Sequence, residues 1–410
     1  MRRCLPGTRA FLSALKLLPL SVFFVGQVPV QAAELPAADR IPVLAWAGPP
    51  QAETNAERYR ELADAGFTHN YSSFSNADEM EKALNVAQAA GIRQFINIPE
   101  LESAPEKIAE RFKAHPALAG YYLRDEPSAS DFPKLAEWTK RIQAVDATHP
   151  CYINLFPNYG TPAGYGTATY PEYLDRFVKE VPVPWISFDH YPVVGKTVRG
   201  EWYENLELVR AAAKAANKPF WAFALAVAHN PYPIATLEHL RLQVFSNLAY
   251  GAQGIQYFTY WTLKSPHWNF HEGPIDNEGK RTAVYDRVKQ VNAEIKALSP
   301  VFLGAKVIQV SHTGPKPSGT RAYESEAPVV AFDAGAKGAL VSLLAKGRQR
   351  HLVIVNRDLH ANMPLKLKFE PNAKISEVGK DGIPHHLAAM EFSSEVTPGD
   401  IRVLSWMSSK

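Results

Sequence analysis

The sequence contains little cysteine. Only Cys4 and Cys151 occur among 410 residues, and Cys4 belongs to an N-terminal segment that we expect to be removed. Cys151 would then be alone, which excludes an intramolecular disulfide, and cysteine implies no metal site. Glycine-rich phosphate turns of the G-x-G-x-x-G or G-x-x-x-x-G-K kind follow none of the expected strands. We therefore expect neither a cofactor nor a metal.

The chain also lacks a strong net charge. Its formal net charge is +3, and residues 1–33 contain four basic residues and no acidic one. These four residues account for more than the whole excess, so the remainder of the chain has no surplus of positive charge. We expect no nucleic-acid partner, because binding to phosphates needs a basic surface.

Long apolar runs are restricted to the N-terminus. Leu17 to Val30 is apolar, follows basic residues and precedes the small residues Ala32 and Ala33. This pattern predicts a secretory signal peptide over residues 1–33. The run is short for a bilayer span and is interrupted by Pro19. We therefore expect an exported protein, periplasmic or extracellular, without stable membrane insertion.

The mature chain is too long for one ordinary domain. Between residues 38 and 300, apolar strand-like runs alternate with amphipathic helical stretches, which is typical of a parallel α/β fold. Eight such runs occur: Ile41–Trp46, Phe67–Ser72, Arg93–Pro99, Leu118–Leu123, Cys151–Phe156, Trp185–His190, Pro219–Leu225 and Gly254–Trp261. Eight strand–helix units in this length predict a (β/α)8 TIM barrel with its active site at the C-terminal strand ends. A doubly wound sheet is the alternative.

Residues 301–410 have a different pattern. Short alternating runs separated by turn residues follow Pro300, for example Ala339–Leu344, His351–Asn356 and Ile401–Trp406. Alternation with a period of two predicts a small C-terminal antiparallel β-sandwich domain. The pattern makes no prediction of oligomeric state.

Two adjacent carboxylates follow the fourth expected strand. The segment from Gly120 to Pro127 reads GYYLRDEP, so Asp125 and Glu126 stand where a barrel enzyme presents its chemistry. Pro127 stops the strand and favours an extended Glu126, which suits a general acid. In the alternative interpretation, the two acids only cap a helix that begins near residues 128–131.

Aromatic and polar residues gather at the other expected strand ends. Rings that stack on sugar faces, together with amides and carboxylates for hydroxyl groups, suit a carbohydrate cleft. His229, and Trp268 in the loop after the last strand, also belong near this mouth. The predicted substrate contacts are Trp46, Asn154, His190, Tyr191, Tyr260 and Trp261.

The chain from residue 41 onward resembles clan-A glycoside hydrolases, loosely those of the family 42 β-galactosidases. The resemblance rests on LRDEP at 123–127, on LAYGAQGIQYFTYW at 248–261 and on PIDNEGKRT at 274–282. It implies a barrel glycosidase with a carbohydrate substrate. It also implies that Glu126 is the acid/base and that Trp261 floors the sugar subsite.

The sequence departs from this family pattern in two places. Asp125 stands where such enzymes usually have asparagine, and residues 223–229 (FALAVAH) lack the glutamate that ends strand seven. A second carboxylate must lie about 5–5.5 Å from the first for retention, or about 6.5–9.5 Å away for inversion. Asp189, after the sixth strand, is the best candidate, and Glu100 and Glu272 are weaker ones.

Two other functions remain open. In a substrate-assisted N-acetylhexosaminidase, Asp125 orients the acetamido group and Glu126 protonates the leaving oxygen, so no protein nucleophile is needed. The other is a non-catalytic carbohydrate-binding protein, which agrees with the apolar end of strand seven.

Overall fold

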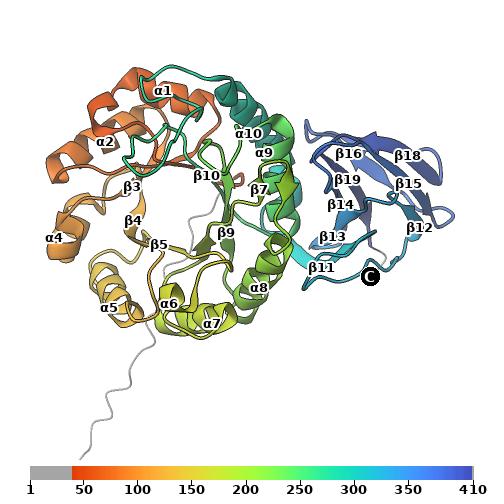
Figure 1. Ribbon diagram of the computed structural model, residues 1–410, viewed down its shortest axis with the longest axis horizontal. Coiled ribbons are helices and arrows are strands. Elements are labelled where there is room, and N and C mark those ends of the chain that lie inside the picture. Colours follow the sequence, from red (N-terminus) through yellow and green to blue (C-terminus); the bar gives the residue numbers. More distant parts are fainter. Residues whose placement is uncertain (1–38, 409–410) are drawn as a thin grey trace, which may run out of the picture. The chain divides into compact units, whose positions relative to one another are not determined.

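The computed structural model describes residues 39–408; the predicted signal peptide, residues 1–33, lies outside them. Eight parallel strands form a closed barrel, with neighbours in the order β1-β10-β9-β6-β5-β4-β3-β2 (Figure 1). The strands are β1 (Val43–Trp46), β2 (His69–Tyr71), β3 (Arg93–Ile96), β4 (Leu118–Asp125), β5 (Cys151–Leu155), β6 (Ile186–Phe188), β9 (Phe220–Leu225) and β10 (Ile255–Phe258). The predicted TIM barrel is confirmed, and the doubly wound alternative is wrong.

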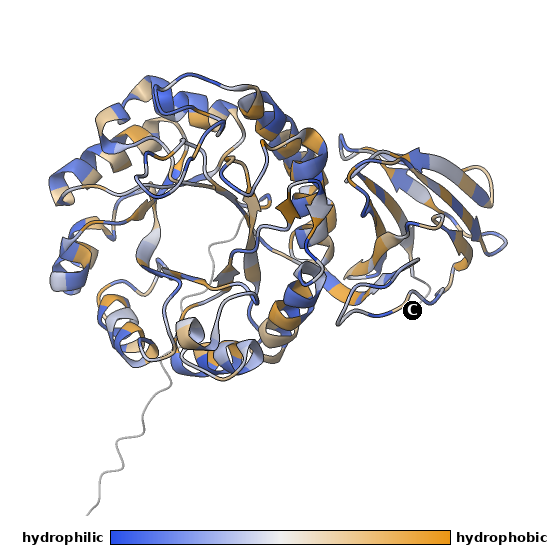
Figure 2. Ribbon diagram, in the orientation of Figure 1, coloured by the Kyte–Doolittle hydropathy of each residue, from blue (hydrophilic) through white to orange (hydrophobic). Residues whose placement is uncertain are grey.

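Helices surround the barrel and alternate with its strands (Figure 1). The main ones are α1 (Ala56–Asp64), α2 (Ala77–Ala89), α4 (Pro105–Phe112), α5 (Phe132–Gln143), α7 (Tyr170–Glu180), α8 (Trp202–Ala215), α9 (Leu237–Ala249) and α10 (Ala283–Phe302). Short elements in the loops are η1 (Gln51–Glu53), α3 (Glu100–Ser103), α6 (Pro162–Tyr165) and the hairpin β7 (Val193–Val194) and β8 (Thr197–Val198). Most helices carry both hydrophilic and hydrophobic residues, as amphipathic helices do (Figure 2).

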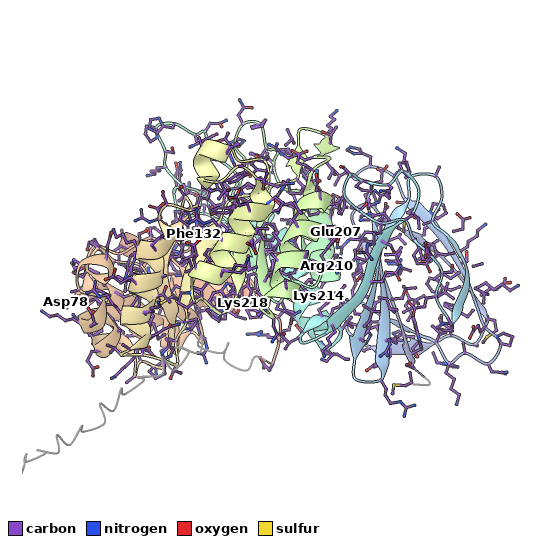
Figure 3. The ribbon with its side chains drawn as sticks, turned by 90° about the horizontal axis from the view of Figure 1, so that it is seen from below. Asp78, Phe132, Glu207, Arg210, Lys214 and Lys218 are labelled. Atoms are coloured by element: carbon purple, nitrogen blue, oxygen red, sulfur yellow. The ribbon has the colours of Figure 1, made fainter. Side chains whose placement is uncertain are left out.

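Aromatic contacts join neighbouring helices of this ring. Phe132, the first residue of α5, is buried and packs on Tyr173 and Phe177 of α7, with ring centroids 5.3 and 5.4 Å apart (Figure 3). On α8, Arg210 lies 2.7 Å from Glu207 (Figure 3). Among residues 39–408, no helix has the length and hydropathy that crossing a bilayer requires.

The interior of the barrel is aromatic. Its buried cluster contains Leu44, Trp46, Phe95, Ala119, Tyr122, Tyr152, Trp185, Trp221 and Phe223. Because alternate residues of a strand face opposite sides, β1, β3, β4, β5 and β9 each contribute one or two of these residues, and Trp185 directly precedes β6. The barrel is therefore a packed core, and an open site can form only at its ends.

The C-terminal part consists of antiparallel sheets. One has six strands in the order β11-β13-β14-β19-β16-β17, and the other has three in the order β12-β15-β18. Their bounds are β11 (Lys306–His312), β12 (Val329–Asp333), β13 (Ala339–Lys346), β14 (Gln349–Asn356), β15 (Met363–Phe369), β16 (Ser376–Val378), β17 (Pro384–His386), β18 (Glu391–Val396) and β19 (Ile401–Met407). One apolar cluster contains residues of both sheets, such as Ile354 and Leu365, so the predicted β-sandwich is confirmed.

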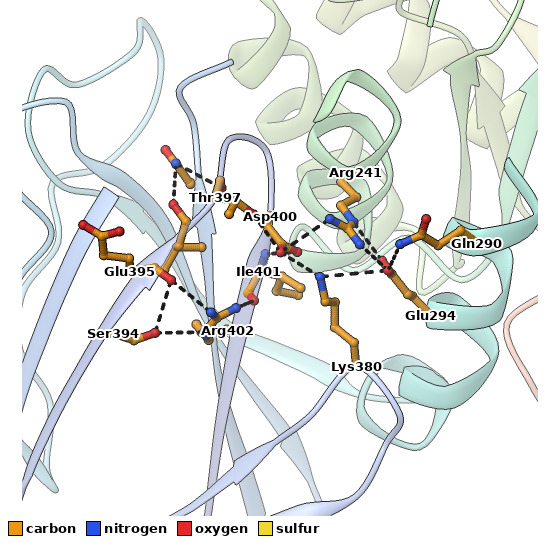
Figure 4. A network of polar contacts seen from close by, with 12 residues as sticks. Arg241, Gln290, Glu294, Lys380, Ser394, Glu395, Thr397, Asp400, Ile401 and Arg402 are labelled. Atoms are coloured by element: carbon orange, nitrogen blue, oxygen red, sulfur yellow. Dashed lines mark hydrogen bonds and ion pairs between the residues drawn. The ribbon is translucent and has the colours of Figure 1, made fainter. Parts of the chain in front are cut away.

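Buried ion pairs connect barrel helices with this β domain. Arg241 of α9 donates from Nε to Glu294 Oε2 of α10 at 3.0 Å. Arg241 Nη1 also lies 3.6 Å from Asp400, which precedes β19 and is 2.7 Å from Lys380 Nζ (Figure 4). Each buried charge thus has an opposite charge beside it, as burial of ions requires.

Candidate active site

The carboxylates predicted from the sequence meet at the C-terminal ends of three neighbouring strands. Asp125 is the last residue of β4, Glu126 follows it, and Asp189 directly follows β6. Asn154 of β5 lies between these strands and donates from Nδ2 to Asp125 Oδ1 at 3.1 Å and to Asp189 Oδ1 at 2.9 Å. The parallel register of β4, β5 and β6 therefore brings together residues that are far apart in the chain.

Glu126 has a backbone conformation that the sequence did not predict. Its φ is +42°, so the expectation that Pro127 holds it extended is wrong. A left-handed residue other than glycine costs about 1–3 kcal/mol and persists only where its surroundings hold it. Here the Glu126 N–H donates to Asn154 O at 2.9 Å, and the carbonyl of Pro127 accepts from Tyr173 Oη at 2.7 Å.

The helix-capping interpretation of these acids is also wrong. Helix α5 begins at Phe132 with Asp131 in the N-cap position. Asp131 Oδ2 accepts from the Ser128 N–H at 3.0 Å. Asp125 and Glu126 thus lie before the first turn of the helix, and Asp125 accepts instead from Asn154.

The electrostatics of the site are dominated by carboxyl groups. Burial, then the negative charge of Asp125, raises the pKa of Glu126 to about 7. Glu126 and Asp189 lie close enough to interact directly, which lowers the pKa of Glu126 against these two effects. The pKa of Asp189 is also raised, first by burial and then by the charges of Glu126 and Asp125. The neighbouring carboxyls therefore make ionisation of Asp189 harder, and Glu126 and Asp189 titrate as a pair.

Asp125 is more open to the cleft than its two neighbours. Its pKa is raised by desolvation, against which the hydrogen bond from Asn154 acts. No lysine or arginine lines the cavity that holds the three carboxylates. No group of His, Cys, Asp and Glu within residues 39–408 is arranged to hold a metal ion.

Aromatic side chains form the remainder of the cavity, which has a volume of about 350 Å³. Tyr191 and Phe258 lie 5.6 Å apart, and His229 lies 4.7 Å from Phe270 and 5.8 Å from Trp268 (ring centroids). The full lining is Trp46, Asp125, Glu126, Asn154, Asp189, Tyr191, Phe223, His229, Phe258, Trp268 and Phe270. Aromatic rings beside hydrogen-bonding groups suit the mixed polar and apolar faces of a sugar.

A second cavity adjoins the first on the side of β2, β3 and β4. Its volume is about 530 Å³, and Trp46 and Asp125 line both cavities. Asn97 in this second cavity donates from Nδ2 to Tyr71 Oη at 2.9 Å and to Ser73 Oγ at 2.8 Å. The carboxylates therefore stand at one end of a cleft that continues past Asp125.

Six of the nine residues predicted for the site line the first cavity. They are Asp125, Glu126, Asp189, Trp46, Asn154 and Tyr191. They share a place at or just after the C-terminal end of a barrel strand, as the sequence analysis expected.

His190, Tyr260 and Trp261 do not line it. His190 is buried behind Asp189, with Nδ1 3.0 Å from Asn205 Oδ1. Tyr260 is fully buried against Phe67, with ring centroids 5.2 Å apart. Trp261 lies under the Arg58 guanidinium, 5.3 Å from its ring centroid. These three residues make packing contacts and lie outside the lining of this cavity; their role as substrate contacts stays a prediction.

The two weaker carboxylate candidates also lie outside the cavity. Glu100 Oε1 accepts from the Ala77 N–H at the start of α2, at 3.4 Å. Glu272 is exposed in the loop between β10 and α10. Asp189 is therefore the carboxylate that meets Glu126.

The sequence analysis did not predict three lining phenylalanines: Phe223, Phe258 and Phe270. Strand β10 ends at Phe258, three residues before the predicted end, so Phe258 takes the place at the strand end that was expected for Trp261. Phe270 lies in the loop of residues 259–282, which pairs with the segment after β9 through Ala228 N–H to His271 O at 2.9 Å. In the sequence, only the aromatic residues of this loop indicated that it lines the cavity.

The chain has detectable similarity to glycosidases. Residues 165–298 match the β-galactosidase model of glycoside hydrolase family 42, and no curated protein sequence matches the chain. A β-galactosidase structure from Bacillus circulans sp. alkalophilus is 10% identical with a TM-score of 0.62, covering 90% of this chain and 99% of that one. A family 42 β-galactosidase from G. stearothermophilus is 9% identical with a TM-score of 0.60, and the match covers 92% of this chain and 100% of that one.

A third β-galactosidase structure, from Marinomonas ef1, is 10% identical with a TM-score of 0.49; the match covers 63% of this chain and 60% of that one. At such identities the solved structures establish the fold alone. The chain thus has the fold of the family 42 glycoside hydrolases, and its resemblance to them is confirmed, with residues 165–298 matching the family's own model.

Proposed function

We propose that the protein is a glycosidase that hydrolyses O-glycosidic bonds of oligo- or polysaccharides. The observation that carries this proposal is that Glu126 and Asp189 line one cavity at the mouth of the barrel, where they interact directly. Two carboxyl groups that flank a glycosidic bond are the usual catalytic pair of such enzymes. The family match of residues 165–298 supports the same reaction class.

The contact favours retention of configuration. Inversion needs carboxyls about 6.5–9.5 Å apart to hold a water molecule, whereas retention needs about 5–5.5 Å. Carboxyls that interact directly stand closer together than inversion requires. In the proposed mechanism, Glu126 protonates the leaving oxygen while Asp189 attacks the anomeric carbon. Glu126 then takes a proton from the water that hydrolyses the glycosyl–enzyme bond.

The environment of Glu126 suits the role of general acid. A carboxyl with a pKa of about 7 is still substantially protonated at neutral pH. Since the protonated form is the active one in the first step, kcat/KM should fall as the pH rises through this value. Asp125 contributes to this raised pKa by its charge.

The shape of the cleft supports a substrate of more than one sugar. The first cavity offers aromatic faces and the carboxylates, and the second continues from Trp46 and Asp125 toward Asn97. A chain that places one residue in the first cavity would extend into the second. β-Galactosides are the first sugars to test, because the matched family model and the Bacillus circulans and G. stearothermophilus structures are those of β-galactosidases.

One observation supports the substrate-assisted alternative. Asp125 is adjacent to Glu126 and opens into both cavities, where it could orient a 2-acetamido group. An N-acetylhexosaminidase of this kind would not need Asp189 as a nucleophile. Asp189 would then act only through its charge and its hydrogen bonds.

The test is hydrolysis of aryl galactoside, glucoside, fucoside and N-acetylglucosaminide by the mature protein and by Glu126→Gln. We expect one glycoside to be cleaved and the variant to lose about 10²–10⁴-fold in kcat/KM, the usual contribution of general acid–base catalysis. Glu110→Gln, an exposed glutamate on α4 paired with Lys113, is the matched control and should retain full activity.

The alternatives give different results in the same assay. Cleavage of the N-acetylglucosaminide alone would favour the substrate-assisted enzyme. Binding of oligosaccharides without turnover on any substrate would contradict catalysis and favour a carbohydrate-binding protein.

Export of the protein is part of the same proposal. It rests on the basic and apolar pattern of residues 1–33. Intact mass spectrometry of protein expressed in a secreting host should give a chain that begins close to residue 34. A full-length mass in the cytoplasmic fraction would contradict export.

A further inference from the structure

Asn154 is the common partner of two of the three carboxylates. Its Nδ2 donates to both Asp125 and Asp189, and its Oδ1 accepts from Ser187 Oγ at 2.9 Å. The side chain is buried. The hydrogen-bonding groups of the amide are thus divided between the carboxylates on one side and a serine hydroxyl on the other.

Ser187 is itself the middle of a longer chain of hydrogen bonds. Gln256 Nε2 donates to Ser187 Oγ at 2.9 Å, and Tyr152 Oη donates to Gln256 Oε1. Tyr152, Ser187 and Gln256 are fully buried inside the barrel. They belong to β5, β6 and β10, so the chain, which we call the amide relay, crosses the barrel beneath the carboxylates.

The amide relay has a direction. A tyrosine hydroxyl donates to the glutamine oxygen, the glutamine nitrogen to the serine, the serine to the asparagine oxygen, and the asparagine nitrogen to the carboxylates. An amide can in principle rotate by 180° and exchange its oxygen and nitrogen. Donation from Ser187 opposes that rotation, because the flipped amide would present its oxygen to two carboxylates and leave the serine hydroxyl only its longer contact with Tyr152 Oη, at 3.4 Å.

We propose that Ser187 and Gln256 are positioning residues of the active site, which hold the Asn154 amide with its N–H groups toward Asp125 and Asp189. The role of these carboxylates in hydrolysis rests on the proposed function. The amide relay itself does not, since its effect on carboxyl ionisation exists without substrate.

The surroundings make Asn154 the main donor to these carboxylates. The ionisable groups near Asp189 are Asp125, Glu126, Tyr152, Tyr159, Tyr170, Tyr173 and Tyr191. The Arg199 guanidinium lies over the Tyr159 ring, 4.5 Å from its centroid. Since no cation lines the cavity, loss of the oriented amide should make ionisation of the carboxyls harder.

Ser187→Ala tests the proposal in the hydrolysis assay. We expect the acidic limb of the kcat/KM profile to move up by about one pH unit, with a loss of about tenfold on that limb and little change in KM, because a donor to the ionised form is lost. Ser187→Thr restores the hydroxyl and should restore the profile. Gln256→Met, one step farther away, should give a smaller shift in the same direction.

Ser246→Ala is the matched control. Ser246 is a fully buried serine on α9 and does not line the cavity that holds the carboxylates. The Ser246→Ala substitution removes the same hydroxyl oxygen as Ser187→Ala, from an equally buried position outside the cavity. Its pH profile should equal that of the unmodified enzyme.

A second measurement needs no substrate. Carboxyls whose pKa is raised in the folded state lower stability as the pH rises, because folding must then bury the ionised form. The Tm deficit of Ser187→Ala should therefore widen between pH 4.5 and 8, while that of Ser246→Ala stays constant. If no glycoside is turned over, the proposed function fails and this titration still decides the amide relay.

Equal and pH-independent Tm deficits in the two alanine variants would overturn the proposal, since Ser187 would then be only a packing residue. An unshifted pH profile in active Ser187→Ala would do the same.

Discussion

The two sides of the barrel mouth carry different chemistry. The ends of β4, β5 and β6 hold Asp125, Glu126, Asp189 and Asn154, whereas the ends of β9 and β10 and the loop of residues 259–282 hold Phe223, His229, Phe258, Trp268 and Phe270. The family resemblance led us to look for a second carboxylate after β9. The three carboxylates therefore lie on the β4–β6 side of the mouth, and an aromatic wall lies on the β9–β10 side.

The backbone after β9 explains why no carboxylate is found there. Ala226 N–H donates to Phe258 O at 2.7 Å, and Ala228 exchanges hydrogen bonds with His271 at 2.9 Å. Residues 226–228 are fully buried. An acid in this segment would be buried without a partner, while the cavity beside it remains lined by rings.

The largest loss of activity is expected from a substitution on the β4–β6 side of the mouth. Asp189→Asn should lower kcat at least about 10³-fold on the best aryl glycoside, because a nucleophile cannot be replaced by the other side of the mouth. The measurement is steady-state kinetics of purified protein. Asp175→Asn, an exposed aspartate on α7 paired with Lys179, is the control and should be fully active.

If Asp189→Asn kept a near-normal kcat, the β4–β6 side of the mouth would not differ from the β9–β10 side in its catalytic role. This result would also exclude Asp189 as the nucleophile.

The aromatic side should give a smaller effect of another kind. Trp268 is 54% exposed at the edge of the cavity, so Trp268→Ala should raise KM about three- to tenfold and change kcat little, since stacking holds substrate and transition state alike. Trp268→Phe should recover most of the loss. Ile308→Ala, which truncates an exposed apolar residue of the β domain, should change neither constant.

If Trp268→Ala changed kcat without changing KM, the aromatic side would not act by binding alone. The aromatic side would then take part in the chemical step.

The fold was largely predictable because its strands are buried on both faces. All eight barrel strands appear as apolar runs. In the β domain, no run was predicted for β12, β16, β17 or β18. Strand β18 reads EFSSEV, with only Phe392 and Val396 buried, so its pattern is too weak to distinguish it from a loop.

Only those site residues that lie at the end of a strand could be predicted from the sequence. Asp125, Glu126 and Asp189 come at or directly after a strand, and their approach follows from barrel geometry. The left-handed Glu126, by contrast, depends on hydrogen bonds from other elements, and the aromatic wall depends on a loop that pairs with residues after β9. Such long-range contacts leave no local periodicity in the sequence.

We expect Asp189, opposite Glu126, to be the residue that attacks the sugar. The most direct measurement is to incubate the enzyme with a 2-deoxy-2-fluoro aryl glycoside of the sugar that it cleaves, which slows hydrolysis of a glycosyl–enzyme intermediate, and to map the labelled peptide by mass spectrometry. We expect one fluorosugar per chain, attached to the peptide that contains Asp189. A label on any other residue, or an unlabelled enzyme that releases product of inverted configuration, would contradict the claim.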